Sequence, residues 1–154
     1  MKVLVATDGS RDSMEAGEFV AMMVAEDPQL EVHLITVMDP SSGLLLASSS
    51  MGLGTEMEPM AISIIPRLNE ILAQNAQRYL DETEQFLAAA GVKVASRRAE
   101  WGNPADVISQ VAEEEEMDLV VVGSRGMGGL TGLLLGSVSD RVVTRCAKPV
   151  LVVR

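Results

Sequence analysis

Hydrophobic residues follow two alternating patterns along this chain: short continuous runs, and longer stretches in which they recur every three or four positions. The continuous runs, rich in valine and leucine, are typical of strands buried on both faces. They occupy residues 3–6, 31–37, 92–99, 118–123 and 149–154. The periodic stretches between them predict amphipathic helices. This alternation predicts an α/β fold, in which an open five-stranded parallel sheet carries helices on both faces.

Residues that favour helix ends support these boundaries. Ser10 follows the first run and is a typical N-cap, and Asn103 with Pro104 opens a later helix in the same way. Pro66 fits the first turn of a long helix. Gly91 stands where that helix would end in a left-handed conformation. The sequence therefore predicts both the number of helices and their approximate limits.

The segment between Asp39 and Pro66 differs from the rest of the chain, because it is rich in serine and glycine and has little periodicity. A connection of this length is unusual in a compact domain. We expect it to be functional, mobile or partly helical near its end. It follows the second strand, so its first residues are expected beside any ligand that binds at the strand ends.

A second glycine-rich segment, GSRGMGGLTGLLLGS, follows the fourth strand and leads into a helix. A helix N-terminus presents unpaired N–H groups and a partial positive charge, both of which favour phosphate. Gly123, Gly126 and Gly136 would let the backbone approach such a ligand closely. Ser137 is expected to cap the helix, in a run ending at Asp140 that resembles a capping box. The segment therefore predicts an anion site, although its glycines could also form only a flexible connection.

Two better-known phosphate motifs are missing. The chain contains no GxxxxGK[ST], and TDGS follows the first strand where a GxGxxG fingerprint would stand. The formal net charge of −10 also argues against a nucleic-acid-binding protein, which needs a basic surface. Backbone amides are therefore the donors with which this acidic chain would hold a polyphosphate.

Composition places the protein in a broad class. The chain of 154 residues has the usual length of one domain, and we expect residues 1–154 to form a single one. The lone cysteine, Cys146, permits no internal disulfide, which fits a reducing compartment. The N-terminus lacks the pattern of a signal peptide, and no apolar run approaches the roughly 20 residues needed to span a bilayer. We therefore expect a cytoplasmic protein without a membrane partner.

The spacing of Gly123, Gly126, Gly136 and Ser137 resembles the G-x2-G-x9-G-[ST] motif of the universal stress protein family, ATP-binding type. The segments VLVATDGS, GNPAD, DLVVVGSRG and KPVLVVR are also similar to that family, and they occur in the same order. The similarity covers essentially the whole chain and is weakest between the second strand and the long helix. It implies a Rossmann-like fold of the adenine nucleotide alpha hydrolase-like type.

The resemblance also implies a ligand and the residues around it. The ligand would be ATP, accompanied by Mg²⁺ or Mn²⁺ that phosphate oxygens and water mainly hold. Asp8 would lie beside the nucleoside or a phosphate-bound metal, although it could also merely cap a turn. Thr7 and the backbone near Val37 would flank the adenine, and Gly123 would face the ribose. The residues implied around the phosphates are Arg125, Gly126, Gly136, Ser137, Val138 and Ser139.

Several other residues are expected to have structural roles. His33 has no second histidine, cysteine or paired acid nearby in sequence, so it is interpreted as a structural histidine. Cys146 is interpreted as a small buried residue and Trp101 as a packing residue. The acidic run at residues 113–116 is typical of a solvated helix face. None of these residues predicts a metal site.

The sequence shows no nucleophile paired with a base and no carboxylate clearly placed to activate water. We therefore expect a regulatory ATP-binding protein of the stress-response kind. The alternatives are a slow ATPase or phosphotransferase, and an interaction module that binds no nucleotide.

The last strand begins at Pro149 and ends at Arg154, and it is almost wholly apolar. If the fourth strand lies on one side of it, its other side is an open edge that invites pairing. In the family that the chain resembles, the same strand of a second subunit covers this edge. We therefore expect a homodimer; the alternative is that a helix or loop of the same chain shields the strand.

Overall fold

The computed structural model describes residues 1–41, 58–126 and 135–154, with side chains omitted for residues 58–64. Its five strands form one parallel sheet in the order β3-β2-β1-β4-β5. The strands are β1 (Lys2–Ala6), β2 (Glu31–Met38), β3 (Val94–Trp101), β4 (Leu119–Gly123) and β5 (Val150–Val153). This confirms the predicted five-stranded parallel sheet.

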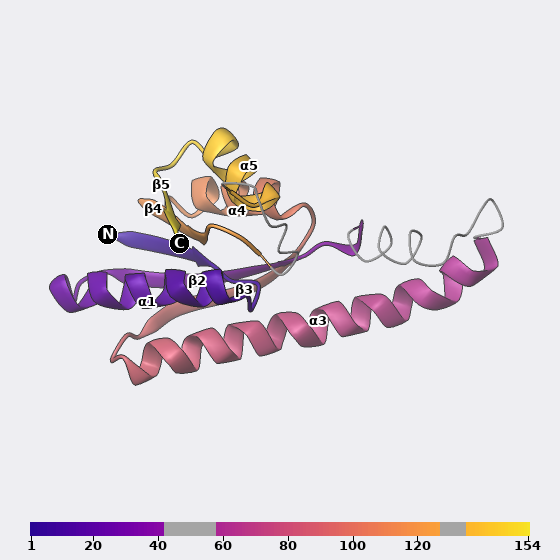
Figure 1. The fold of residues 1–154 in the computed structure, drawn as a ribbon, viewed down its shortest axis with the longest axis horizontal. Helices are drawn as coiled ribbons and strands as arrows, with labels where there is room; N and C mark the ends of the chain where they lie inside the picture. Colours follow the sequence, from indigo (N-terminus) through magenta and orange to yellow (C-terminus); the bar gives the residue numbers. More distant parts are fainter. Residues whose placement is uncertain (42–57, 127–134) are drawn as a thin grey trace.

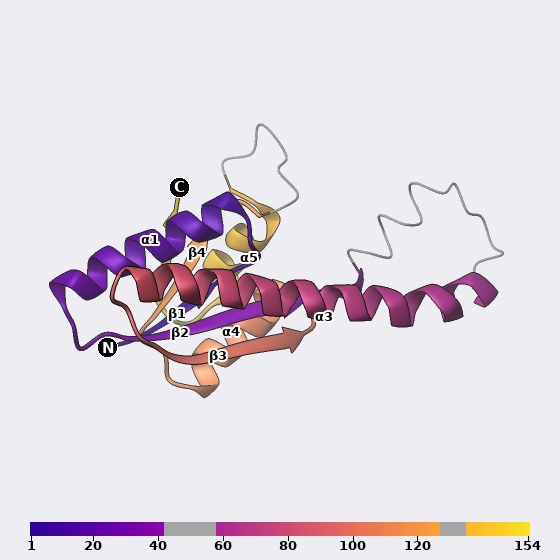
Figure 2. The same cartoon turned by 90° about the horizontal axis from the view of Figure 1, so that it is seen from below.

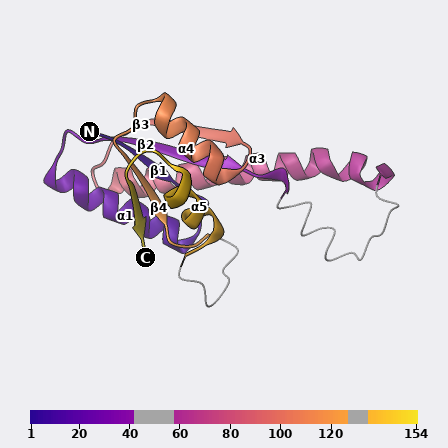
Figure 3. The same ribbon diagram turned by 90° about the horizontal axis from the view of Figure 1, so that it is seen from above.

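Four helices cover the two faces of the sheet (Figure 1). They are α1 (Arg11–Glu26), α3 (Glu58–Ala89), α4 (Pro104–Glu114) and α5 (Ser137–Arg145). Seen from below, α1 and α3 lie in front of the strands (Figure 2), whereas α4 and α5 lie in front of them when seen from above (Figure 3). The helices on both faces confirm the predicted α/β class. No helix among the described residues is long and apolar enough to cross a bilayer.

The two faces of the sheet support two separate cores. Val3 and Val5 of β1 belong to the core beneath α1 and α3, whereas Leu4 between them belongs to the core beneath α4 and α5. All three side chains are at most 1% exposed. A strand that is buried on both faces needs apolar residues at every position, which explains the continuous runs in the sequence.

The predicted caps of α1 and α4 are confirmed. The Ser10 hydroxyl accepts a hydrogen bond from the Ser13 amide at 3.2 Å, which begins α1. The Asn103 side chain accepts bonds from the amides of Ala105 and Asp106 at the start of α4. At the end of α3, Gly91 has the expected positive φ of 80°.

The predicted start of the long helix is wrong. Helix α3 begins at Glu58, so Pro66 lies inside it rather than in its first turn. A proline inside a helix removes one hydrogen bond. Pro66 is exposed, so its ring lies on the solvent side of the helix. The segment between Asp39 and Pro66 is therefore partly helical near its end. This confirms one of the three alternatives that its sequence left open. Residues 42–57 lie outside the described part.

The third strand lies slightly later in the chain than the sequence predicted. Val92 was expected to open it, but its amide donates to the carbonyl of Leu87 at 2.9 Å and closes the end of α3. An amide used by a helix C-terminus is not available to a strand ladder. The strand accordingly starts at Val94 and continues to Trp101.

The strand order places a switch point between β1 and β4. Helix α1 follows β1 onto one face, and α5 follows β4 onto the other. Connections that leave neighbouring strands on opposite faces open a crevice at the carboxyl ends of those strands, where α/β proteins bind ligands. The turn after β1 and the glycine-rich segment after β4 both begin at the edge of the sheet that these carboxyl ends form.

Candidate functional site

The turn after β1 holds a carboxylate at the edge of the sheet. The Thr7 amide donates to the carbonyl of Ile35 at 2.9 Å, which extends the pairing with β2 by one residue. The Asp8 carboxylate then accepts the amide of Ser10 at 3.0 Å. An aspartate that bonds the amide two residues later forms a local turn and fixes its own side chain. Asp8 is therefore held half-buried at the end of β1.

The glycine-rich segment brings Gly126 against this carboxylate. A Cβ atom added to Gly126 would lie 2.5 Å from Oδ2 of Asp8, closer than real Cβ contacts. The same turn binds the segment a second time, because the Ser10 hydroxyl donates to the carbonyl of Arg125 at 3.3 Å. Arg125 itself is exposed. Two predicted site residues from neighbouring strands, Asp8 and Gly126, are thus in contact.

Helix α5 begins at this same edge without a capping side chain. Its N-cap residue is Gly136, which has extended backbone angles of φ −73° and ψ 161°. The prediction that Ser137 caps the helix is therefore wrong: Ser137 already has a helical backbone and is the first residue of the helix. Since Gly136 supplies no hydroxyl or carboxylate, the positive end of the α5 dipole is not neutralised by an N-cap side chain.

Ser139 is turned away from solvent. Its hydroxyl donates to the carbonyl of Ser124 at 2.8 Å and lies 3.0 Å from the carbonyl of Gly136. It is only 3% exposed. By contrast, Ser137 and Val138 are exposed in the same turn. Ser139 therefore anchors the helix to the glycine-rich segment, and the other two residues face outward.

Two of the motif glycines make room for the protein itself. A Cβ on Gly123 would lie 2.5 Å from the Asp12 carbonyl carbon, so this glycine admits the first turn of α1. A Cβ on Gly136 would lie 3.2 Å from the Cα of Arg125. Gly126 differs, because the atom that it would meet is the end of a side chain. The predicted role of Gly123 beside a ribose stays a prediction.

The side chain of Thr7 points into the core rather than along the edge. Its hydroxyl lies 2.9 Å from that of Thr83 on α3 and 3.4 Å from that of Ser13 on α1. All three side chains are at most 3% exposed. Val37 is half-buried on β2 and packs against the core beneath α4. Thr7 can therefore face the expected adenine position with its backbone but not with its side chain, and the predicted role of the backbone near Val37 stays a prediction.

Two contributors to this edge were not identified from the sequence as site residues. The ring of Tyr79 on α3 fills the space beside Gly9, where an added Cβ would lie 2.2 Å from the ring. The hydroxyl of Ser124 donates to the carboxylate of Asp12 at 2.7 Å. The one available signal for Ser124 was its position, as a polar residue directly after an apolar strand and between two motif glycines.

The residues expected to be structural lie elsewhere. His33 on β2 pairs its Nδ1 with the hydroxyl of Ser96 on β3 at 2.7 Å. Cys146 is half-buried at the end of α5. Trp101 ends β3 with 47% of its surface exposed, so it is not a core residue. Within the part of the chain that the structure describes, no group of three or more His, Cys, Asp or Glu residues could hold a metal ion.

Comparison with known proteins decides the family. The model of the universal stress protein family matches residues 1–154. The chain belongs to this family. Universal stress protein MJ0531 of Methanocaldococcus jannaschii is 35% identical over 153 residues, which are 99% of this chain and 81% of the relative. Universal stress protein YxiE of Bacillus subtilis is 33% identical over 153 residues, which are 99% of this chain and 98% of the relative.

Solved structures of universal stress proteins share the fold. Protein MJ0577, a test case for assigning biochemical function from structure, matches with a TM-score of 0.76 and 28% identity, covering 99% of this chain and 94% of that one. A universal stress protein in complex with cAMP matches with a TM-score of 0.63 and 25% identity, covering 100% and 96%. A family member from Arabidopsis thaliana with AMP bound has a TM-score of 0.64 and 20% identity, covering 99% and 90%.

Proposed function

We propose that this universal stress protein binds ATP at the edge formed by the turn after β1, the segment after β4 and the start of α5. The proposal rests chiefly on the contact between Asp8 and Gly126, because it brings the turn after β1 and the glycine motif together beside an N-cap without a side chain. A helix N-terminus of this kind favours phosphate. The cAMP complex of a relative supports an adenine nucleotide as the ligand.

A divalent ion would accompany the phosphates. Asp8 is the residue of the site that offers Mg²⁺ or Mn²⁺ a carboxylate oxygen, the ligand type that these ions prefer. One carboxylate does not make a complete site, so phosphate oxygens and water would supply the remaining ligands. We therefore propose that the metal binds with the nucleotide rather than before it.

A regulatory role fits the site better than fast catalysis does. The two buried serine hydroxyls of the segment are already committed, Ser124 to Asp12 and Ser139 to a carbonyl. The single histidine of the chain, His33, is bonded to Ser96 on β3. The Ser124 and Ser139 hydroxyls are both buried, so neither is open to a substrate as an activated nucleophile. Slow hydrolysis assisted by Asp8 remains the second candidate, and turnover well above that of Asp8→Ala would favour it.

Replacing Gly126 with valine tests the nucleotide site. Gly126 does not have a positive φ, so its backbone tolerates a side chain, and among the described residues the new Cβ would meet the end of the Asp8 side chain. We expect the dissociation constant for ATP, measured by calorimetry, to rise by at least about tenfold, which corresponds to ~1.4 kcal/mol. Gly136→Val is a poorer test, because it would also disturb the backbone of Arg125.

Ala95→Val, at an exposed position of β3, is the matched control and should keep the wild-type affinity. Circular dichroism should show that both variants remain folded. Wild-type affinity in folded Gly126→Val would contradict the proposed phosphate position. No binding of ATP, ADP or AMP by the wild type would reject the proposal and favour a nucleotide-independent interaction module.

We also propose that the protein is a cytoplasmic homodimer that pairs through β5. Strands β3 and β5 are the two edges of the sheet. Edge β3 carries Arg97 and Arg98, and charged side chains discourage pairing between sheets. Edge β5, with the sequence VLVV, carries no charge. Two copies joined by a two-fold axis would cover this edge and close at a dimer.

A further inference from the structure

Ser124 lies at the centre of the proposed site and uses all of its polar atoms. Its hydroxyl donates to Oδ2 of Asp12 on α1 at 2.7 Å. Its carbonyl accepts the amide of Gly136 at 2.7 Å and the hydroxyl of Ser139 at 2.8 Å. Its amide donates to the carbonyl of Val153 on β5 at 2.6 Å. One residue thus joins α1, α5 and β5.

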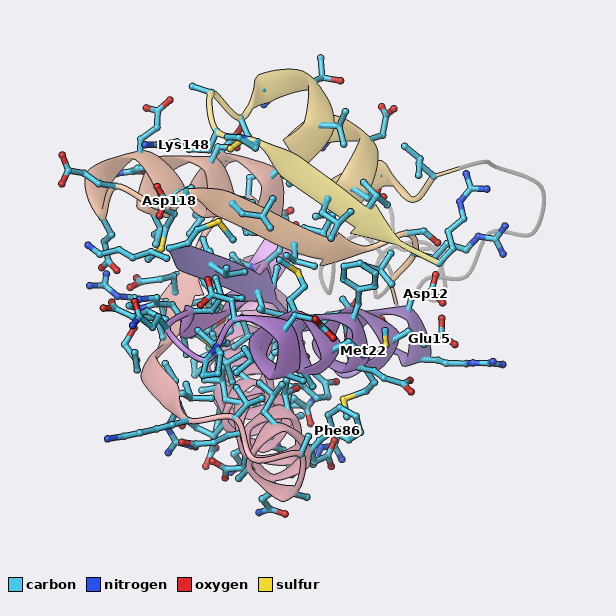
Figure 4. All side chains as sticks on the ribbon, turned by 90° about the vertical axis from the view of Figure 1, so that its left-hand side faces the viewer. Asp12, Glu15, Met22, Phe86, Asp118 and Lys148 are labelled. Carbon is cyan, nitrogen blue, oxygen red and sulfur yellow. The ribbon has the colours of Figure 1, made fainter. Side chains whose placement is uncertain are left out.

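Two of the three connections lead to elements beside the proposed ligand. Helix α1 follows the Asp8 turn, and α5 presents its N-terminus to the same edge. Asp12 lies in the first turn of α1, and Figure 4 shows it at the end of that helix, close to the tip of β5. The side chain of Ser124 therefore joins the glycine-rich segment to α1, while its carbonyl joins the segment to α5.

The burial of Ser124 separates it from residues that would touch a ligand. The residue is 4% exposed, and its hydroxyl is committed to Asp12. The two residues that follow it differ: Arg125 and Gly126 are exposed. A hydroxyl that is buried and already bonded cannot reach a phosphate. Its effect on binding must therefore be exerted through the backbone that it holds in place.

From these contacts we infer that Ser124 is a positioning residue of the nucleotide site, with Asp12 as its anchor on α1. The inference rests on the proposed ATP site and identifies what fixes its geometry. The hydroxyl–carboxylate bond sets where the segment lies relative to α1. The two bonds to its carbonyl then set where α5 begins. Together they fix the distance between the Asp8 turn and the amides of α5, across which the phosphates would lie.

The inference predicts a selective loss of phosphate binding. In Ser124→Ala the carbonyl bonds to α5 remain, but the anchor on α1 is lost. We expect the dissociation constant for ATP to rise about five- to tenfold, which is the net effect of losing about one typical hydrogen bond. The dissociation constant for adenosine, which has no phosphate, should stay within about twofold. A general loss of structure would instead weaken the binding of ATP and of adenosine by similar factors.

Two further variants test the role of the acceptor. Asp12→Ala removes it and should reproduce the loss of ATP affinity seen in Ser124→Ala. Asp12→Asn keeps an acceptor oxygen and should restore most of that affinity. In the double variant Ser124→Ala/Asp12→Ala the loss should not exceed that of either single variant, because both remove the same bond. Ser109→Ala, which removes a hydroxyl bonded within α4, is the matched control.

Calorimetry with ATP and with adenosine on these full-length variants decides the inference. An unchanged dissociation constant for ATP in folded Ser124→Ala, beside a wild type that binds ATP, would overturn the role of Ser124 and leave the ATP site intact. Equal losses for both ligands would also overturn it. A wild type that binds no ATP would instead reject the proposed function, and the inference with it.

Discussion

Gly9 and Tyr79 illustrate how single residues build the turn after β1. Gly9 has a φ of 75°, which residues with a side chain rarely adopt. The ring of Tyr79 occupies the space that a side chain there would need. The conformation and the packing therefore both require glycine at this position. The neighbouring Asp8 is held where it is because this turn is tight.

Replacing Gly9 with alanine should destabilise the protein. The strained φ and the collision with Tyr79 together should lower the free energy of unfolding in urea by about 3 kcal/mol. The double variant Gly9→Ala/Tyr79→Ala provides the control. Relative to Tyr79→Ala alone, the added alanine should cost only about 1 kcal/mol, because the strained backbone remains and the collision does not. Equal costs in both backgrounds would show that the ring does not constrain the turn.

Sequence reasoning identified most individual signals but not their contacts. Ser10 and Asn103 were predicted as caps, and both cap their helices. Ser137 was expected to cap α5, but Gly136 does so, because the choice depends on backbone angles that a serine next to a glycine does not reveal. The contact of Asp8 with Gly126 joins residues far apart in the chain, and no local pattern could predict that geometry.

Elements are connected in this molecule by a small buried cluster of hydroxyls. Thr7, directly after β1, meets Ser13 of α1 and Thr83 of α3 between the sheet and the two helices. Thr83 and Tyr79 are four residues apart and so share one face of α3, through which this helix reaches the turn after β1. The periodicity predicted an amphipathic helix here, but not that the Thr83 hydroxyl would bond to residues of two other segments.

Thr83→Val tests what this cluster contributes. Valine has nearly the same shape but leaves the Thr7 hydroxyl without its closest partner in a fully buried position. The free energy of unfolding in urea should fall by about 1–2 kcal/mol. The exposed Thr144→Val, which removes a hydroxyl bonded to the carbonyl of Asp140 in α5, should cost no more than about 0.5 kcal/mol. A cost as small as that of the control would mean that the hydroxyls of the cluster contribute no net stability.

At the scale of the whole molecule, the alternation of strands and helices was sufficient to predict the fold class. It was not sufficient to predict the strand order β3-β2-β1-β4-β5. The order depends on which strands pair across long stretches of chain, as when Val3 lies opposite Leu119. The start of α3 was misplaced because Pro66 is a local signal that the surrounding helix overrides.

The proposed dimer can be tested without adding charge to β5. The carbonyls of Pro149 and Val153 accept bonds from β4, so alternation leaves the amides of Val150 and Val152 pointing to the open edge. Val152→Pro removes one of these outward donors and keeps the pairing with β4. Light scattering should give a dimer mass for the wild type at micromolar concentration and a monomer mass for the variant. A monomer mass for the wild type would contradict the proposed dimer. A dimer mass for the variant would mean that the interface does not involve the β5 edge.

The central position of β1 has a consequence for how the protein is made. Its neighbour β2 emerges from the ribosome soon after it, whereas Asp118, which bonds Lys2 and directly precedes β4, follows 116 residues later. At a synthesis rate of about 10 residues per second, the second edge of β1 stays open for roughly ten seconds. During that interval an apolar strand edge is exposed to other nascent chains and to chaperones. Gly126 lies three residues after β4, so the chain that covers this edge of β1 is made almost together with the Gly126 part of the proposed nucleotide site.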